Sequence, residues 1–371
     1  MRYGRGGLAR AALTGASFAG YNIGSGFSTG IEGMQFFAAW GAGVAACSVA
    51  VAALISAAVL AAIYVVGSER AFKDDGEVYS FFCGKYFGPV ADAYIYASMF
   101  FVVLTMMTGA GAAIRQYCGL PQYVGSAVMG AMCVAAAMLG LERLMRVLGY
   151  MCFFIIIFVV VCGVCAFFTS DTGPLAGSAR AAEYVADGKI LRAMVFGFHN
   201  PYLMGPLSAG LFIEAGFAWA AAAGALCSGR KEAVLSGIFS SFFYYATTSV
   251  VVALILASMD YIAGEEVPML AVVHHYLPAL TGFYYFIIVL AIFSTVSGRL
   301  FLLASRFGRG SKRRRNAILI GVTLFAVVFG GFLSFSRISN VIMSVMGSAG
   351  ILICISALVK FCKYLREEPR A

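Results

Sequence analysis

Long apolar runs alternate along the chain with short polar segments. A helix needs about 20 predominantly apolar residues to cross the hydrocarbon core of a bilayer. The pattern predicts ten such spans, at residues 13–40, 44–67, 90–116, 123–141, 148–169, 191–226, 233–259, 280–306, 317–335 and 341–363. We therefore expect an all-α polytopic membrane protein that forms a single transmembrane domain.

The first predicted span is interrupted by glycine and polar residues. Five glycines fall between positions 20 and 33, and each costs a helix about 1 kcal/mol relative to alanine. A broken helix is tolerated in hydrocarbon only where protein or a wet cavity surrounds it. The pattern predicts a mid-membrane break of the kind that holds a substrate or an ion. The alternative is close helix packing, because the pairs Gly20/Gly24 and Gly26/Gly30 have small-xxx-small spacing.

The sixth span is too long for one straight helix and predicts a second break. Residues 197–206 include Pro201 and Pro206, and a proline inside a helix costs about 3 kcal/mol or more. If this stretch were a loop between two spans, the chain would have eleven spans and its termini would lie on opposite sides. We favour the broken helix, because eleven spans disturb the distribution of charge described below.

The two predicted breaks open two successive sets of five spans. Because five is odd, the second set enters the membrane from the opposite side. Matching interruptions in two inverted halves indicate a substrate site where the halves meet. We therefore predict a five-plus-five inverted repeat, with repeat one at about residues 11–170, repeat two at about 191–363 and a cytoplasmic tail at 364–371. The repeat is inferred from this pattern, since the halves share no clear residue identity.

Composition and charge agree with a membrane protein. Hydrophobic residues make up 61% of the chain and charged residues 12%, whereas a soluble domain carries about 25% charge. The long unbroken apolar runs exclude a transmembrane β-barrel. The net charge of +9 could suggest a nucleic-acid partner, but the basic residues lie in short loops, where they orient a membrane protein.

The positive-inside rule fixes the expected orientation. With both termini cytoplasmic, 20 of the 26 Lys and Arg residues fall on the inner side, 5 on the outer side and Arg299 within a span. This asymmetry predicts a multi-pass protein of the cell's inner (plasma) membrane and supports the number of spans. The run Lys312–Arg315 is interpreted as an orientation anchor, with anionic lipid binding as the alternative.

Two loops and the cysteines carry further predictions. Residues 69–88 mix charges with aromatic residues and predict an amphipathic helix along the cytoplasmic face. Residues 260–278 predict a short outer helix or a partial re-entrant cap. Most of the ten cysteines lie within apolar runs and are expected to be small buried hydrophobic residues. The pair Cys162 and Cys165 has redox or zinc spacing, but it lies inside a span without a second pair.

One motif resembles a known family. The run Gly24-Ser25-Gly26-Phe27-Ser28-Thr29-Gly30-Ile31-Glu32, followed by Gln35-Phe36-Phe37, resembles the first-helix signature of the YkvI-type family of bacterial membrane transporters. Residues 267–270 and 292–297 resemble that family's outer loop and eighth helix more weakly. The family is placed near the amino acid–polyamine–organocation superfamily, whose members have the five-plus-five inverted-repeat fold of the LeuT type. The resemblance implies a fold and a transport mode, but no cargo.

The resemblance also implies a sodium site. In similar transporters Na⁺ lies between the break in helix one and helix eight. The matching ligands here are carbonyls of Gly20, Ile23 and Ala291 and hydroxyls of Ser294 and Thr295, with Ser297 as the alternative hydroxyl. Oxygen ligands suit Na⁺ as they suit Ca²⁺. The alternative for the two hydroxyls is ordinary hydrogen bonding within and between helices.

The substrate is expected beside this ion. Free N–H groups at the start of the second half-helix suit a carboxylate, so an amino acid, another small zwitterion or an anion fits. Recognition of an amine is left open. The expected substrate contacts are Asn22, Gly24, Ser25, Gly26 and Phe27 from the first break and Phe198, His199, Asn200 and Tyr202 from the sixth span.

Ionisable residues inside a membrane are usually functional or paired. For Glu32 we favour a role as a cap of freed N–H groups, with a cation partner or a proton carrier as alternatives. Glu214 and Arg299 are assigned to coupling or to an inner gate. His199 is interpreted as a hydrogen-bonded cavity residue, with a proton carrier as the alternative.

Together these observations predict a secondary active transporter that moves a small polar solute by alternating access, coupled to Na⁺ by symport. The alternatives are proton coupling through Glu32 or His199, and a membrane sensor that binds a ligand without transporting it. An enzyme is not expected, because the sequence has no His-Glu-x-x-His or Gly-x-Ser-x-Gly motif. Apart from Na⁺ no cofactor is expected, the solute and the lipid bilayer are the expected partners, and the oligomeric state is left open.

Overall fold

The computed structural model describes residues 5–22, 25–70, 72, 74–138, 157–158, 160–165, 168, 173–308 and 311–367. These residues are mainly helical. The helices are α1 (Arg5–Asn22), α2 (Ser25–Ser28), α3 (Ala42–Glu69), α4 (Asp75–Cys118), α5 (Gln122–Met138), α7 (Pro174–Ala186), α8 (Met204–Glu214), α9 (Phe217–Gly224), α10 (Arg230–Ala257), α11 (Met259–Ile262), α12 (Pro268–Tyr276), α13 (Thr281–Phe307), α14 (Lys312–Gly330) and α15 (Phe335–Glu367).

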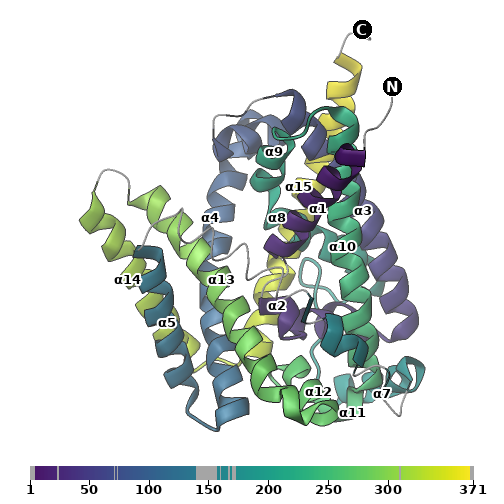
Figure 1. Ribbon diagram of the computed structural model, residues 1–371, viewed down its shortest axis with the longest axis vertical. Helices are drawn as coiled ribbons and strands as arrows, with labels where there is room; N and C mark the ends of the chain where they lie inside the picture. Colours follow the sequence, from purple (N-terminus) through teal and green to yellow (C-terminus); the bar gives the residue numbers. More distant parts are fainter. Residues whose placement is uncertain are drawn as a thin grey trace.

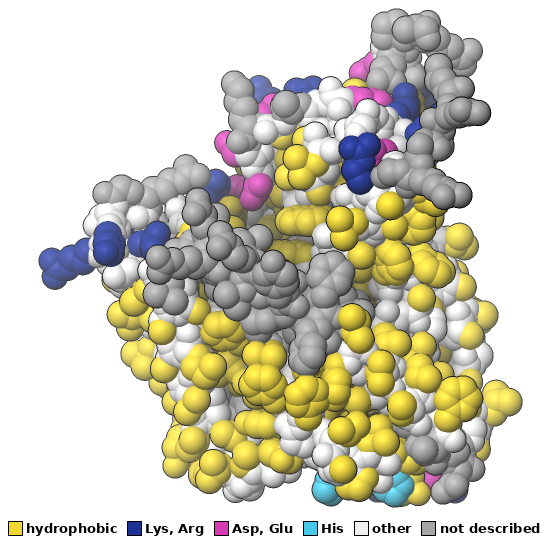
Figure 2. All heavy atoms as spheres, in the orientation of Figure 1, with side chains coloured by type: hydrophobic (Ala, Val, Ile, Leu, Met, Phe, Trp, Pro, Cys, Tyr) yellow, Lys and Arg dark blue, Asp and Glu magenta, His cyan; other side chains and the backbone are white. Residues whose placement is uncertain are grey.

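The structure is that of a polytopic membrane protein. Among the described residues, α3, α4, α10, α13 and α15 are long and apolar enough to cross a bilayer, and the bent pair of α8 and α9 is a sixth such segment. Figure 2 shows apolar side chains over most of the visible face, with Lys and Arg gathered towards one end. Most of the predicted fifth span, residues 148–169, lies outside the described residues, so the count of ten stays a prediction.

The arrangement brings distant parts of the chain together. In Figure 1, α1, α3, α8 and α10 form one packed group, and α15 runs along α8. On the other side α13 packs on α4, and α5 and α14 lie beside them. The first residues of α1 and the last turn of α15 lie at the same end of the molecule, as an even number of spans requires.

The predicted interruption of the first span is confirmed. α1 ends at Asn22 and α2 begins at Ser25, and the two residues between them lie outside the described residues. α2 ends at Ser28, and the helix is interrupted at Gly30, whose φ of +80° lies in the left-handed region that favours glycine. The chain then continues as a π-helical turn, η1 (Gly33–Phe37), and a 3₁₀ turn, η2 (Ala38–Trp40).

Neighbouring helices satisfy the backbone groups that this break leaves free. The Tyr284 hydroxyl of α13 donates to the Ser28 carbonyl at 2.8 Å. The Met269 backbone N–H of α12 donates to the Thr29 carbonyl at 3.0 Å. These contacts explain how a broken helix is tolerated in the interior, where an unpaired carbonyl is costly.

The predicted position of the second break is wrong. Residues 191–200 form no helix; they make a tight turn in which Val195 and Phe198 exchange two backbone hydrogen bonds of 2.9 Å. Pro201 opens a 3₁₀ turn, η3 (Pro201–Leu203), and Pro206 lies in the first turn of α8. The prolines mark the start of the helix, because a first-turn N–H has no helical partner to lose.

The sixth span is instead interrupted ten residues further on. Between the end of α8 and the start of α9 lie Ala215 and Gly216, and the two helices are bent by 62°. A Cβ atom at Gly216 would lie 2.6 Å from the ring of Phe18, so glycine allows this bend to pack closely on α1. The helix of this region is therefore interrupted, but at residues 215–216 and not at the predicted 197–206.

The two loop predictions are confirmed as helices. α4 begins with Asp74 as its N-cap and bends at Gly84, whose φ is +82°, so that residues 75–83 form a separate short segment before the span. On the other face, α11 and α12 occupy the region predicted as an outer helix or cap, and α12 contacts the first break through the Met269 N–H.

Close glycine contacts hold α8 against α15. A Cβ atom at Gly350 would overlap the backbone of Gly210, and one at Gly210 would overlap the backbone of Gly347 and Gly350. We predict that Gly350→Val lowers the free energy of unfolding by about 1–3 kcal/mol, the usual cost of overpacking. Gly321→Val on α14 is the matched control, because a Cβ there has no neighbour within 4 Å. Thermal unfolding in detergent checks both; equal midpoints for the two variants would contradict the packing described.

Candidate functional site

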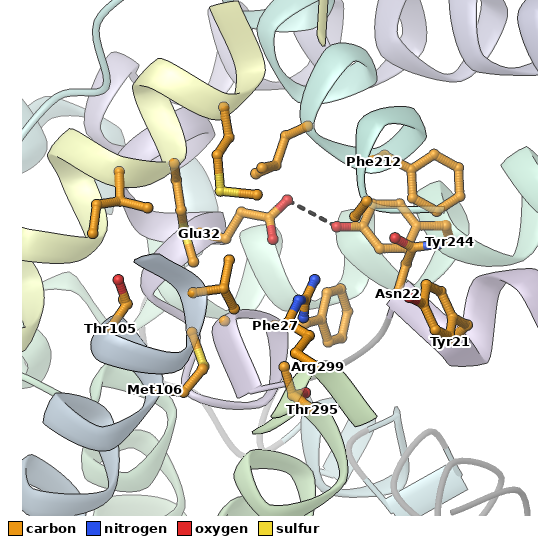
Figure 3. A pocket seen from close by; sticks show the side chains of 17 residues that line it. Tyr21, Asn22, Phe27, Glu32, Thr105, Met106, Phe212, Tyr244, Thr295 and Arg299 are labelled. Atoms are coloured by element: carbon orange, nitrogen blue, oxygen red, sulfur yellow. Dashed lines mark hydrogen bonds between the residues drawn. The ribbon is translucent and has the colours of Figure 1, made fainter. Parts of the chain in front are cut away.

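A cavity of about 70 Å³ lies where the two broken spans meet (Figure 3). Its walls come from the α1–α2 break, from α8 and the first residue after it, and from α4, α10, α13 and α15. Interrupted helices bring backbone groups and polar side chains into the interior, and this cavity is lined by both kinds of group.

The structure places the first group of predicted substrate contacts at this cavity. Asn22, Gly26 and Phe27 line it. Gly24 and the side chain of Ser25 lie outside the described residues. The helix that follows the break is short, since α2 has only four residues, so the expected helix dipole is much weaker here than in a full half-helix.

The second group of predicted substrate contacts lies elsewhere. Phe198 and Tyr202 are 74% and 90% exposed in the segment that precedes α8. His199 has its ring near Trp40, with centroids 6.2 Å apart, and Asn200 accepts the Tyr202 N–H at 3.0 Å. None of these four residues lines the cavity. They lie apart from the cavity because the prolines belong to a helix start and not to the break, and their contact with a substrate stays a prediction.

The cavity walls include residues that the sequence did not reveal. Phe212 and Ala215 come from the true break of the sixth span, and Tyr244 comes from α10. Thr105 and Met106 come from α4. Gly216, two residues after Glu214 within an apolar run, was a signal in the sequence that could have located the break. The apolar pattern of α4 and α10 does not indicate which face of each helix points towards the cavity.

Glu32 lines the cavity and accepts a hydrogen bond from α10. It occupies the N-cap position of η1 but makes no capping hydrogen bond with its side chain. Its Oε1 accepts instead from the Tyr244 hydroxyl at 2.8 Å (Figure 3). The N–H groups at the first break lie partly outside the described residues, so the role of Glu32 as their cap stays a prediction. The second oxygen, Oε2, lies close to Gly26, where an added Cβ atom would be 3.8 Å away from it.

Arg299 and Glu214 lie near one another without forming an ion pair. Arg299 lines the cavity one turn beyond Thr295 on α13, and the described residues give it neither a hydrogen bond nor an ion pair. Glu214 is 1% exposed, and its Oε1 accepts from the Ser98 hydroxyl at 2.7 Å. Its Oε2 has no hydrogen-bond partner within the described ranges. The role of the two residues in coupling or gating stays a prediction.

The structure describes four of the five residues that were predicted to bind sodium. Ile23 lies outside the described residues, and Gly20 is buried in α1. The hydroxyls of Ser294 and Thr295 both donate to the Ala291 carbonyl at 2.9 Å, and Thr295 also lines the cavity. In the part of the chain that is described, no group of three His, Cys, Asp or Glu residues could hold a metal ion.

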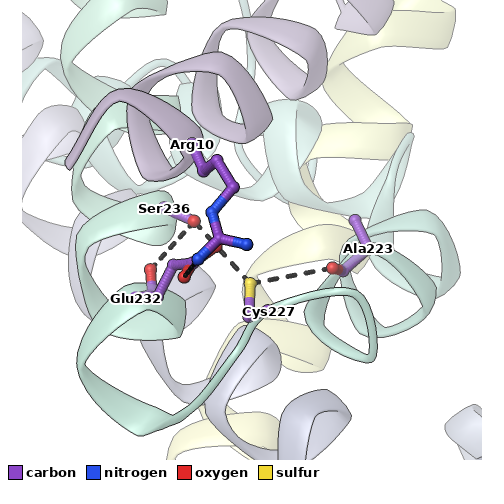
Figure 4. A network of polar contacts seen from close by, with 5 residues as sticks. All are labelled: Arg10, Ala223, Cys227, Glu232 and Ser236. Atoms are coloured by element: carbon purple, nitrogen blue, oxygen red, sulfur yellow. Dashed lines mark hydrogen bonds and ion pairs between the residues drawn. The ribbon is translucent and has the colours of Figure 1, made fainter. Parts of the chain in front are cut away.

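Ion pairs join helices at the end of the molecule where α1 begins and α15 ends. Arg10 of α1 lies 3.4 Å from Glu232 of α10, beside a polar cluster that includes Ser236 and Cys227 (Figure 4). Arg306 of α13 pairs with Asp92 of α4. These contacts hold α1 and α13 to their neighbours on the side opposite α12.

The hydrogen bond between Tyr244 and Glu32 gives a testable prediction. We expect Tyr244→Phe to lower the free energy of unfolding by about 1–3 kcal/mol, because a buried acceptor loses its donor. In the Glu32→Gln background the same change should cost less, so the two effects should not add. Tyr202→Phe is the control, since that side chain is 90% exposed. Thermal unfolding of the four variants checks this; strict additivity would contradict the contact.

The chain was compared with known proteins. It matches no protein-family model, and no curated protein matches it by sequence. The resemblance to the YkvI-type family therefore stays a prediction.

Similarity to solved structures is clearer. The crystal structure of MhsT in complex with L-phenylalanine matches with a TM-score of 0.62 and 14% sequence identity, over 97% of this chain and 92% of that chain. A manganese transporter of Eremococcus coleocola matches with a TM-score of 0.49, at 12% identity over 95% and 78% of the two chains. A Na⁺-coupled sialic acid symporter matches with a TM-score of 0.44, at 16% identity over 94% and 84%. The match to MhsT shows that the chain shares its fold, which is of the LeuT type.

Proposed function

We propose that the protein is a secondary active transporter that binds a small polar solute in the central cavity and moves it by alternating access. The observation that carries this proposal is the cavity itself: two interrupted spans meet there, and Asn22, Glu32 and Arg299 are among the residues that line it. Ionisable groups at such a place are costly, and they are usually paired or act on a ligand. The fold shared with MhsT, which was crystallised with L-phenylalanine, supports a small organic solute.

We further propose the full ten-helix arrangement, with repeat one at residues 11–170, repeat two at 191–363 and a short tail at 364–371. In it the α1–α2 pair and the α8–α9 pair are the first helices of the two inverted halves. The matching breaks support this arrangement, as does the common end at which α1 begins and α15 stops. The gathering of Lys and Arg near that end supports cytoplasmic termini in the plasma membrane.

Coupling to Na⁺ is the ion scheme that we propose for the transport cycle. The hydroxyls of Ser294 and Thr295 give their hydrogens to the Ala291 carbonyl, so their oxygen lone pairs stay available to a cation. Proton coupling is the second scheme, and Glu32 is the residue that favours it, because its carboxylate borders the cavity. His199 no longer supports that scheme, since it lies outside the cavity walls.

A ligand sensor would need the same cavity, so solute flux separates it from a transporter. We expect purified protein in proteoliposomes to take up one member of a panel of radiolabelled amino acids and related small solutes with saturation. Phe27→Ala should lower its apparent affinity about tenfold, because a cavity wall is lost. Phe198→Ala, the same change at an exposed site outside the cavity, should have little effect. Binding of a solute without uptake would favour the sensor, and the reverse pattern of the two variants would contradict the assigned cavity.

Thermal stability tests the coupling ion. A ligand that binds only the folded protein raises its stability by RT ln(1 + [L]/Kd), about 2.7 kcal/mol at 100 times Kd. We expect higher stability in Na⁺ than in K⁺ at equal ionic strength, and a larger difference when the solute is present. Ser294→Ala with Thr295→Ala should remove the difference.

The opposite result assigns the second scheme. Equal stability in Na⁺ and K⁺, together with a solute effect that changes with pH, would overturn sodium coupling. Glu32→Gln should then abolish the pH dependence of solute binding if protons are coupled through this carboxylate.

A further inference from the structure

Two side chains of opposite charge border the central cavity without touching each other. Glu32 comes from the segment just before η1, and Arg299 comes from α13 (Figure 3). Within the described part of the chain, neither takes part in an ion pair. Elsewhere the protein does pair charges between helices, as in Arg10 with Glu232 and Arg306 with Asp92. The central charges therefore differ from the pairs at the end of the bundle.

Separate charges in a membrane interior are strongly unfavourable unless another group compensates them. A singly charged solute could pair with Glu32 or with Arg299, but not with both, and Arg299 would then keep only the attraction of the nearby Glu214. An uncharged solute would compensate neither. A solute that carries both charges satisfies both side chains and leaves the net charge of the cavity unchanged.

The surroundings of Glu32 suit an ammonium group. One oxygen is occupied by the Tyr244 hydroxyl at 2.8 Å, which fixes the carboxylate and leaves Oε2 free to accept from a ligand. The rings of Phe27 and Tyr244 lie 5.9 Å apart, and Phe212 stacks on Tyr244 at 4.1 Å. Aromatic faces attract cations, so these rings add to the attraction of the carboxylate.

Access to that oxygen depends on Gly26. A Cβ atom there would lie 3.8 Å from Glu32 Oε2 and 2.7 Å from the Met343 methyl group. A side chain at this position would therefore fill the space that a ligand's ammonium group needs.

Arg299 suits a carboxylate. A guanidinium group presents several N–H donors in a planar fork that matches the two oxygens of a carboxylate. Glu214 attracts this guanidinium from nearby, but its Oε1 is already bound to Ser98 and it forms no ion pair with the arginine. The donors of Arg299 are therefore available to a ligand in the cavity.

We propose that the solute is a zwitterion whose ammonium group binds Glu32 and whose carboxylate binds Arg299. Its carboxylate is thus held by a side chain of α13, and not chiefly by the N–H groups of the four-residue helix α2. This inference deepens the proposed transport function, but the binding it describes does not depend on transport.

Calorimetry on the full-length protein in lipid nanodiscs tests the ligand class. The probes are the proteinogenic amino acids, β-alanine and γ-aminobutyrate. The tightest binder is then compared with its amide, which lacks the carboxylate, and with its deaminated acid, which lacks the ammonium group. We expect each singly charged relative to bind at least about tenfold more weakly. A relative that binds as tightly as the zwitterion, or a panel in which nothing binds, would overturn the proposal.

Variants then assign the two poles. In Arg299→Gln the zwitterion should lose its advantage over the amide but keep its advantage over the deaminated acid; in Glu32→Gln the reverse should hold. Arg313→Gln and Glu183→Gln remove the same charges at exposed sites and should keep both advantages. If Arg299→Gln does not fold, Arg299→Lys, which keeps the charge without the fork, should still prefer the zwitterion. Unchanged preferences in both cavity variants would sink the assignment.

Uptake by proteoliposomes keeps the two proposals apart. Charge-dependent binding of a zwitterion without uptake would reject transport and leave the binding site standing. Saturable uptake of a singly charged solute, with no binding of a zwitterion, would reject the zwitterion site and leave transport standing.

Discussion

A backbone carbonyl in hydrocarbon needs a donor from the protein, and this requirement shapes the centre of the molecule. The glycine-rich first span stops being a regular helix at Gly30, which frees the carbonyls of Ser28 and Thr29. The donors come from α13 and α12, through Tyr284 and Met269. The break therefore determines which helices must pack around it. The cavity lies beside this break, among the helices that pack around it.

The first break could be predicted because its cause is local. Several glycines within one span weaken a helix wherever that span is placed. The second break could be predicted to exist, but not at its true position, because a proline disrupts a helix interior and favours a helix start. Whether Pro201 lies inside the helix or at its beginning is decided by tertiary structure. At the true break, Gly216 is needed because of Phe18, a contact between spans one and six.

The same limit applies to the candidate site. Asn22, Gly26 and Phe27 were predicted because they belong to the break itself. Tyr244 was not, since a tyrosine in an apolar span gives no sign of which helix it faces. Glu32 was recognised as unusual, but its partner comes from α10, more than two hundred residues away in the sequence. A charged residue within an apolar span could therefore be recognised from the sequence, whereas its hydrogen-bond partner could be identified only from the folded structure.

The hydrogen bond from the Met269 N–H to the Thr29 carbonyl joins the short helix α12 to the interrupted part of the first span. If α12 moves away from the bundle, this carbonyl loses its donor, and water is the natural replacement. Separation of α12 and hydration of the break would then be a single event. A displaced α12 would leave the Thr29 carbonyl without a donor unless water reached it. Entry of water from the side of α12 is therefore linked to the hydrogen bonding of the first span.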